Sequence, residues 1–217
     1  MIVNPDPDLS QAGAAVALGP SQTARKAVLG LGILCSIAFL FVAGSYEVDG
    51  GFVHEGIEWL GVVLIVVCIL GRTWSTLYIG GRKNAELVTY GPYSICRNPL
   101  YTFSIIGAIG VGAQFGSMTV ALVCGFFAWI VFHWTALREE AAIAAAFPDD
   151  FRRYAARVPR FFPDLRLWNS PQTITVQPRA IATTFFDALI FLTAIPLMET
   201  FEYFHDAGIL PVFLKLP

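Results

Sequence analysis

The chain has 217 residues, of which 56% are hydrophobic and only 14% are charged, and its mean hydropathy is +0.63. This is more apolar side chain than the core of one soluble domain of this size uses. The composition therefore excludes an ordinary soluble protein and predicts a chain that crosses a membrane several times. The formal net charge is −2, so the charge does not favour nucleic acid as a partner.

The N-terminal third of the chain contains two predicted spans. Residues 1–26 are rich in proline and small residues and are expected to be a disordered tail. The apolar run at residues 27–46 has the length needed to cross the hydrocarbon layer. An acidic segment, residues 46–58, leads into a second apolar run at residues 57–79, which returns through the bilayer. Residues 27–79 are therefore expected to form the first two transmembrane helices.

A polar passage at residues 80–99 separates the second span from a helical hairpin. Residues 100–115 and 118–137 are apolar, and because only two residues connect them, the two helices must run antiparallel. Small residues recur at helical spacing on the first arm of this hairpin. We expect them to let the second arm approach closely; they are Gly107, Gly110 and Ala113.

The second helix of the hairpin runs on into the polar sequence REEAAIAAAF and is expected to end at Pro148. A short amphipathic helix follows at residues 150–158, with Asp149 or Asp150 as its N-cap. Together with the polar passage and the hairpin, these helices form the predicted core of the protein, residues 80–163.

A polar linker, residues 164–179, leads to one more span at residues 180–197, and the C-terminal part, residues 180–217, ends in an acidic tail. Lys and Arg favour the cytoplasmic side of membrane proteins. With the N-terminus in the cytoplasm, every Lys and Arg except Lys215 falls on that side. The sequence therefore predicts an all-α polytopic transmembrane helix bundle of about five spans, in a bacterial inner membrane.

This topology places two polar segments that are far apart in the sequence, residues 80–99 and 138–163, on the cytoplasmic face. They can form one pocket there. The glutamate pair Glu139 and Glu140 is costly to place beside hydrocarbon unless a cation receives it. Because adjacent helical residues point about 100° apart, the pair cannot act as one acid–base dyad, so one carboxylate points into the pocket while the other meets Arg138 or solvent.

Simpler interpretations exist for the same residues. The glutamate pair is also compatible with a solvated helix face, and Arg97 with the anchoring of lipid headgroups. His133, inside the second arm of the hairpin, is interpreted as a packing residue, with a place in a channel for the substrate as the alternative. Four cysteines without CxxC spacing and three scattered histidines give no predicted metal site.

A carboxylate, aromatic rings and arginines suit a ligand with a positive centre, a carboxylate and a flat heterocycle, which describes S-adenosylmethionine. Two stretches also carry a family resemblance: LVTYGPYSICRNPLY, residues 87–101, and REEAAIAAAFPDDFRRYAARVPRF, residues 138–161. They resemble the paired motifs of the isoprenylcysteine carboxyl methyltransferase and phospholipid methyltransferase superfamily, which consists of integral membrane methyltransferases. The resemblance covers residues 78–162 and leaves the first and last spans outside it.

The resemblance implies that both motifs hold S-adenosylmethionine, with residues 157–160 and Tyr154 folding over the pocket as a lid. The implied cofactor contacts are Leu87, Val88, Tyr93, Asn98, Pro99, Leu100, Tyr101, Glu139 and Tyr154. The chain departs from the family pattern where Asn98 replaces the usual His, which removes a titratable group. It also has Pro148 where the family often has Gly, and Thr135 where the prenylcysteine enzymes carry a substrate arginine.

We therefore expect an S-adenosylmethionine-dependent methyltransferase whose lipophilic acceptor, an isoprenoid or prenylcysteine-like carboxylate or thiol, enters from the surrounding membrane lipids. Arg97 or Arg138 would orient an anionic acceptor, and Glu140 would take the proton of an amine. A phospholipid N-methyltransferase of the phosphatidylethanolamine type is the alternative within the enzyme class. A non-catalytic membrane scaffold and a small transporter or reductase subunit are the alternatives of other classes.

Overall fold

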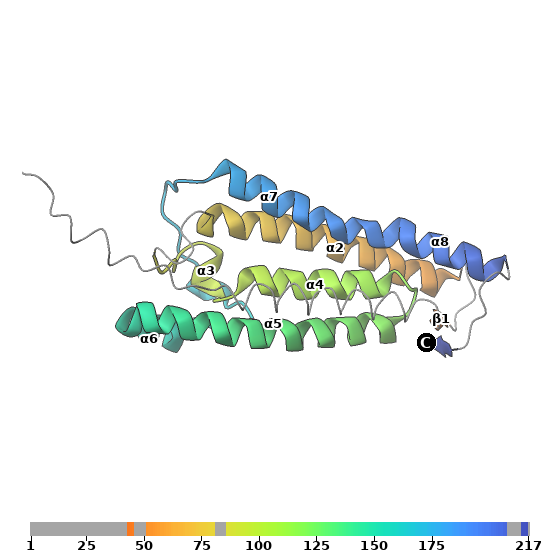
Figure 1. Cartoon of the computed structure of the whole chain (residues 1–217), viewed down its shortest axis with the longest axis horizontal. Helices are drawn as coiled ribbons and strands as arrows, with labels where there is room; N and C mark the ends of the chain where they lie inside the picture. The colour runs from red at the N-terminus through yellow and green to blue at the C-terminus, as the bar shows by residue number, and fades with distance from the viewer. Residues whose placement is uncertain (1–42, 46–50, 81–85, 208–213, 217) are drawn as a thin grey trace, which may run out of the picture. The chain divides into compact units, whose positions relative to one another are not determined.

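The structure is a computed structural model that describes residues 43–45, 51–80, 86–207 and 214–216 (Figure 1). The first predicted span, residues 27–46, lies outside the described residues except for 43–45. The other four predicted spans all fall on helical segments. The prediction of a helical membrane bundle is therefore confirmed for the part of the chain that can be compared.

Three helical segments of the described chain are long and apolar enough to cross a membrane: α2 (Phe52–Ile79), α5 (Met118–Ala146) and the segment Pro178–Phe201. Helix α4 (Pro99–Ala113) is also apolar but shorter. The segment at Pro178 is built from three consecutive elements, α7 (Pro178–Ala188), the 3₁₀ helix η3 (Leu189–Thr193) and α8 (Ala194–Asp206). Helix α2 begins before the predicted start of its span, so residues 52–58 belong to the helix.

Helix α4 lies between α2 and α5, and α7 packs along α2 (Figure 1). The turn between α4 and α5 comprises residues 114–117, two more than predicted, because α4 already ends at Ala113. Gly116 adopts a φ of +62°, a left-handed conformation that favours glycine. The next residue, Ser117, is the N-cap of α5, and its side chain accepts a hydrogen bond from the backbone N–H of Val120 at 3.3 Å.

The small residues of α4 that were predicted to face the hairpin partner α5, Gly107, Gly110 and Ala113, make close contact with α2 instead. A Cβ atom on Gly110 would lie 2.8 Å from the carbonyl oxygen of Gly61 in α2. Contact with α5 instead uses Gly112, where a Cβ atom would lie 2.8 Å from the Cα atom of Ala121. The predicted partner was wrong because helical spacing shows which residues share a face, but does not identify the helix that this face contacts.

Helix α5 ends at Ala146 and α6 (Pro148–Arg157) begins two residues later, so Pro148 separates the two helices as predicted. The predicted cap was wrong. Phe147 occupies the N-cap position of α6 and makes no side-chain cap hydrogen bond. Asp149 and Asp150 lie in the first turn, where a negative charge is favourable because it faces the positive end of the helix dipole.

The polar linker packs against the single-turn helix α3 (Pro92–Ile95) and contains the 3₁₀ helix η2 (Leu165–Leu167). The N–H of Asp164 donates to the carbonyl of Ile95 at 3.0 Å. The ring of Trp168 stacks on that of Trp74 in α2, with centroids 5.7 Å apart. Two short parallel strands, β1 (Ala43–Ser45) and β2 (Leu214–Leu216), pair with each other.

The two polar segments that were predicted to share a face lie at the same end of the bundle. This end contains α3, the start of α4, the end of α5 and α6, as Figure 1 shows. The side chains of Arg97 and Glu140, which belong to the two different segments, are in contact there. A single site formed by both segments is therefore possible.

Candidate functional site

Helix α3 is one turn long and places Tyr93 in the interior. It begins after Gly91, which has a φ of +62°, and Pro92 at the first helical position fixes the next backbone angle. The Ser94 hydroxyl donates to the carbonyl of Gly91 at 2.7 Å and closes the turn. Tyr93 is only 5% exposed as a result.

Glu140 is the centre of a buried ion-pair network. Its carboxylate accepts from the Arg160 guanidinium, through Nε at 3.1 Å and Nη2 at 3.0 Å, and the Arg97 Nη1 atom lies 3.3 Å away. The amide nitrogen of Asn98 donates to the same carboxylate at 2.9 Å. Glu140 is 7% exposed, and two cations with an amide donor compensate the cost of burying its charge.

The backbone around this network is also joined. The N–H groups of Arg97 and Asn98 donate to the carbonyls of Pro159 and Arg160, at 2.9 and 3.2 Å. The hydroxyl of Thr102 donates to the carbonyl of Phe161 at 3.0 Å. The residues predicted as a lid, 157–160, are therefore held against the start of α4 by both main-chain and side-chain hydrogen bonds.

The thiol of Cys96 takes part in the same junction. Its Sγ atom lies 3.4 Å from the carbonyl oxygens of Arg160 and Phe161. Burial raises the pKa of the Cys96 thiol, against the smaller opposing effects of the Thr102 hydrogen bond and the Arg97 charge. The neutral thiol is the form that can donate a hydrogen bond to these carbonyls.

Tyr93 and Tyr154 form the aromatic part of the site. The Tyr154 hydroxyl donates to the carbonyl of Tyr93 at 2.7 Å. The Tyr93 hydroxyl is buried and has no hydrogen-bond partner among the described residues. Burial raises the pKa of Tyr93, and the neighbouring Tyr154, Cys96 and Glu139 raise it further. A buried phenol that stays neutral and unpaired is available to a ligand.

The other predicted cofactor contacts surround this centre. Tyr101 is buried and stacks on Phe132 of α5, with ring centroids 5.1 Å apart. Glu139 is half-buried, and its charge is among the effects that raise the pKa of Tyr93. The remaining positions are buried at Val88 and Pro99 and half-buried at Leu87 and Leu100.

Of the three residues predicted to be catalytic, two lie together and one lies apart. Arg97 and Glu140 are bound to each other. Arg138 is exposed and, within the described part of the chain, forms no ion pair with either of them. Arg160 takes the place expected for Arg138 as a partner of the glutamate pair. Arg160 was predicted to lie in the lid, but not beside Glu140. The sequence feature that could have indicated it is the Arg160–Phe161 pair at the end of the second motif.

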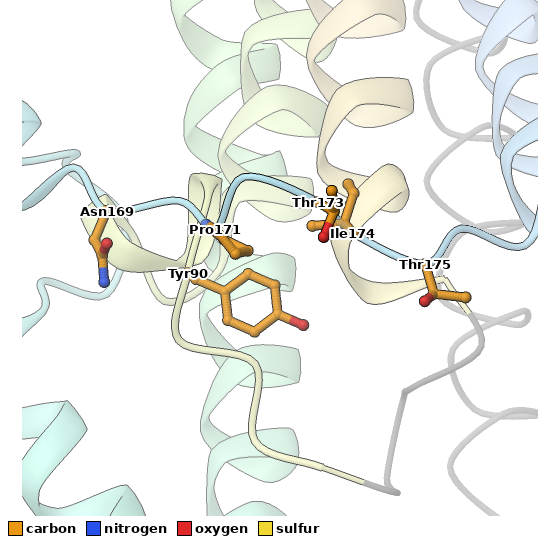
Figure 2. A pocket seen from close by; sticks show the side chains of 6 residues that line it. All are labelled: Tyr90, Asn169, Pro171, Thr173, Ile174 and Thr175. Atoms are coloured by element: carbon orange, nitrogen blue, oxygen red, sulfur yellow. The ribbon is translucent and has the colours of Figure 1, made fainter.

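An open cavity of about 420 Å³ lies on the outer side of the linker, next to α3. Figure 2 shows the Tyr90 ring beside Pro171, with Thr173, Ile174 and Thr175 along the linker. The linker is attached here through the Asn169 carbonyl, which accepts from the N–H of Gly91 at 2.7 Å. The six lining residues carry no charge, so this cavity lacks the carboxylate that a sulfonium ligand requires.

The described residues contain no group of three or more His, Cys, Asp or Glu side chains that could hold a metal ion. This finding concerns only the described ranges.

Comparison with known proteins identifies a family and two similar proteins. Residues 57–150 match the family model described as phospholipid methyltransferase. The chain is 37% identical over 184 residues to the cobalt-zinc-cadmium resistance protein CzcN of Cupriavidus metallidurans, covering 85% of this chain and 83% of that protein. It is 31% identical over 185 residues to the nickel-cobalt-cadmium resistance protein NccN of Alcaligenes xylosoxydans xylosoxydans, covering 85% and 86%. No solved structure gives a significant match.

Proposed function

We propose that this chain, which belongs to the phospholipid methyltransferase family of membrane proteins, transfers a methyl group from S-adenosylmethionine to a lipophilic acceptor. The observation that carries the proposal is the group of residues around Tyr93. A buried phenol without a partner, a second buried tyrosine and the Glu139 carboxylate meet where two motifs of the family come together. The site faces the cytoplasm in this proposal, because the Lys and Arg residues gather at that end.

The residues present fit S-adenosylmethionine. The Glu139 carboxylate would attract the sulfonium, and the Tyr93 hydroxyl would hydrogen-bond a polar atom of the ligand. Tyr101 and Tyr154 supply the aromatic surroundings that suit an adenine ring and a positive centre. When bound, the cofactor supplies an electrophilic methyl group.

The protein contributes mainly by positioning, because methyl transfer needs an aligned nucleophile and no covalent help from the enzyme. Holding two reactants in line and excluding water can together provide about 7 to 11 kcal/mol of the barrier. The Glu140 network serves this purpose, since it fixes the segment at residues 158–161 against the start of α4. We assign Glu140 and Arg97 to this positioning role, because they are bound to each other and Glu140 is also bound to Arg160.

The acceptor would reach the site from the bilayer along α4 and α5. The outer face of α5 carries exposed apolar side chains that suit contact with lipid; they are Leu122, Val123, Phe126, Phe127, Trp129 and Trp134. A lipid that slides along this face arrives at the layer of Tyr101 and Phe132, directly below the glutamate pair. This route is compatible with a phospholipid or an isoprenoid acceptor.

Binding of S-adenosylhomocysteine to the purified protein in nanodiscs tests the proposed site. We expect Glu139→Gln and Tyr93→Phe to weaken binding by at least about tenfold, because each removes a charged or hydrogen-bonding contact. The matched controls are Glu199→Gln and Tyr203→Phe, which change exposed residues of α8 and should bind as the wild type does. Equal affinity in all four variants would exclude this site, and no binding by the wild type would favour a non-catalytic scaffold.

Transfer to lipid tests the reaction itself. Membranes with wild-type protein or Glu139→Gln are incubated with S-adenosylmethionine that carries a tritiated methyl group, and the lipid and protein fractions are counted separately. Label in lipid, with a matching mass gain of one methylene, would identify a lipid acceptor. Label confined to protein would point to a prenylcysteine-like acceptor, and no label above the Glu139→Gln background would contradict the proposed function.

The names of the two relatives suggest the process that the reaction serves. Both are named as resistance proteins for cobalt and cadmium, with zinc or nickel. We therefore infer that methyl transfer by this chain supports growth in the presence of these metals. A deletion strain should grow less well in cadmium, and Glu139→Gln should fail to restore growth although the protein is present in the membrane. Restoration by Glu139→Gln would separate metal tolerance from catalysis.

A further inference from the structure

His133 lies on the face of α5 that leads to the candidate site. It precedes Glu140 by seven residues, which is close to two helical turns, so both side chains belong to the same face of the helix. The rise between them is about 10 Å toward the membrane interior. Ala136, between the two, is completely buried in the cluster of Tyr101 and Phe161.

The imidazole of His133 is packed between two aromatic rings of different exposure. Its centroid is 5.8 Å from the ring of Phe161, which is 8% exposed and directly follows Arg160 of the Glu140 network. It is 5.2 Å from the ring of Trp129, which is 39% exposed on the apolar surface of α5. His133 therefore lies where the lipid-facing surface meets the wall of the site.

The Nδ1 atom of His133 is enclosed and has no hydrogen-bond partner among the described residues. A histidine that served only to pack would be expected to satisfy this nitrogen, since buried polar groups without partners are costly. The other side chains able to accept a proton nearby are already engaged or assigned. Glu140 is neutralised by Arg97 and Arg160, and Glu139 is assigned to the sulfonium in the proposed function.

The remaining titratable groups around His133 come from the elements that enclose it. Helix α4 contributes Tyr101, which packs in one cluster with Phe161, and the segment after α6 contributes Arg160, which precedes Phe161 and whose guanidinium is bound to Glu140. The other two histidines of the chain, His54 and His205, belong to the start of α2 and the end of α8, at the opposite end of the bundle. His133 is thus the imidazole that an acceptor entering along α5 would meet.

Resting on the proposed function, we propose that His133 is the proton acceptor of the reaction and that the methyl acceptor is an amine, hydroxyl or thiol rather than a carboxylate. The lone pair of the acceptor atom forms the new bond to the methyl carbon, the sulfur–methyl bond breaks, and its electron pair remains on sulfur. The proton of the acceptor atom passes to His133, which releases it to water. The donor leaves as the neutral thioether.

The need for a base defines this acceptor class. A carboxylate acceptor has no proton to lose, so it would leave His133 without a role. A neutral nucleophile needs a base instead, which His133 provides. Asn98, which replaces the family's usual histidine, cannot provide one because an amide does not titrate at physiological pH.

The experiment compares wild type with His133→Phe and His133→Asn in vesicles of total membrane lipid from the native host. Phe keeps the ring between Trp129 and Phe161, so the fold should be retained. We expect both variants to bind S-adenosylhomocysteine within twofold of wild type, while kcat falls by about 100-fold and the acidic limb of the pH profile of kcat disappears. An unchanged kcat in both variants, with normal binding and transfer by the wild type, would contradict this inference alone. A wild type that neither binds S-adenosylhomocysteine nor transfers methyl groups would contradict the proposed function.

Chemical modification gives a second result that does not depend on the variants being active. Diethyl pyrocarbonate should modify His133, as found by mass spectrometry of the peptide, and abolish methyl transfer without changing the affinity for S-adenosylhomocysteine. The His133→Phe variant should lose no further activity on treatment. Modification of His133 with full retention of transfer, or an acidic limb that persists in both variants, would overturn the proposal and leave His133 as a packing residue.

Discussion

Glu139 and Glu140 are adjacent in the sequence and have different surroundings, because one step along a helix turns the side chain by about 100°. Glu140 is buried among two arginines and an amide, whereas Glu139 is half-buried near Tyr93. This arrangement gives the two carboxylates separate roles. One joins the polar segments of the protein, and the other is assigned to the ligand in the proposed function.

Replacing Glu140 should affect stability more than ligand binding. We expect Glu140→Ala to lower the free energy of unfolding by about 3 kcal/mol, since it leaves the largely buried Arg97 and the half-buried Arg160 without their counter-ion. Glu139→Gln, one residue earlier, should change stability little and reduce cofactor affinity. Thermal unfolding of both variants in detergent, measured beside ligand binding, checks this assignment. Equal losses of stability would show that the two glutamates have the same role.

The buried phenol of Tyr93 predicts a loss of stability at alkaline pH. An unfolded tyrosine ionises near pH 10.0, whereas burial raises the pKa of Tyr93 well above that value. Above pH 10 the unfolded chain therefore releases a proton that the folded chain retains, and stability falls by about 1.4 kcal/mol per pH unit for this residue. Tyr93→Phe should make the decline of the melting temperature between pH 9.5 and about pH 11 shallower.

Tyr203→Phe is the matched control for that measurement, because Tyr203 is largely exposed. A decline that is the same for wild type, Tyr93→Phe and Tyr203→Phe would mean that Tyr93 ionises normally in the folded protein. At neutral pH, Tyr93→Phe should retain full stability, since the hydroxyl it removes has no partner among the described residues.

Among the elements, α4 determines how the bundle packs, because it lies between α2 and α5 and contacts both closely. Its small residues serve two different neighbours. Gly110 approaches the backbone of α2 at Gly61, and Gly112 approaches α5 at Ala121. Close backbone approach is the usual basis of helix association in membranes, where apolar side chains gain little by leaving lipid.

Adding one methyl group at this contact should separate the helices. Gly110→Ala would place a Cβ atom 2.8 Å from a backbone oxygen of α2, which cannot move aside as a flexible side chain does. We expect a loss of about 1 to 3 kcal/mol in unfolding free energy. Gly56→Ala is the control, since nothing lies within 4 Å of a Cβ atom there. Equal stability of the two variants in thermal unfolding would contradict the close contact.

For the whole of the described chain, the arrangement that matters is the meeting of residues 86–99 with residues 138–161 at one end of the bundle. Helices α4 and α5 lie between the two segments in the sequence. Because the chain runs along the bundle in α4 and back again in α5, both segments lie at the same end. This is the condition for a shared site, and the contact between Arg97 and Glu140 meets it.

Thiol labelling of single-cysteine variants tests which side of the membrane this end occupies. Cysteines at Glu86 and Arg157, both exposed, should react with an impermeant maleimide only in inside-out vesicles. Cysteines at Glu55 and Ala207, exposed at the opposite end, should react only in spheroplasts. Labelling of Glu86 and Arg157 from opposite sides would contradict the shared site, whereas reversal of all four would place the site outside the cytoplasm.

The sequence by itself determined the four apolar segments that the structure describes as helical, the helical hairpin and the existence of two polar segments at one end of the bundle. These features follow from the length of apolar runs, the short turn at Gly116 and the break at Pro148, all of which act through neighbouring residues. The same local patterns indicated Tyr93, Asn98, Glu139 and Tyr154, because each belongs to a motif that is contiguous in the chain.

Only the tertiary structure decided which partners these residues meet. Arg160, and not Arg138, neutralises Glu140, and Gly110 contacts α2 rather than the next helix in sequence. The physical reason is that a helical pattern fixes the direction of a side chain around its own axis, whereas the neighbour in that direction depends on how several helices pack together. Contacts between residues 20 to 60 positions apart are settled by that packing.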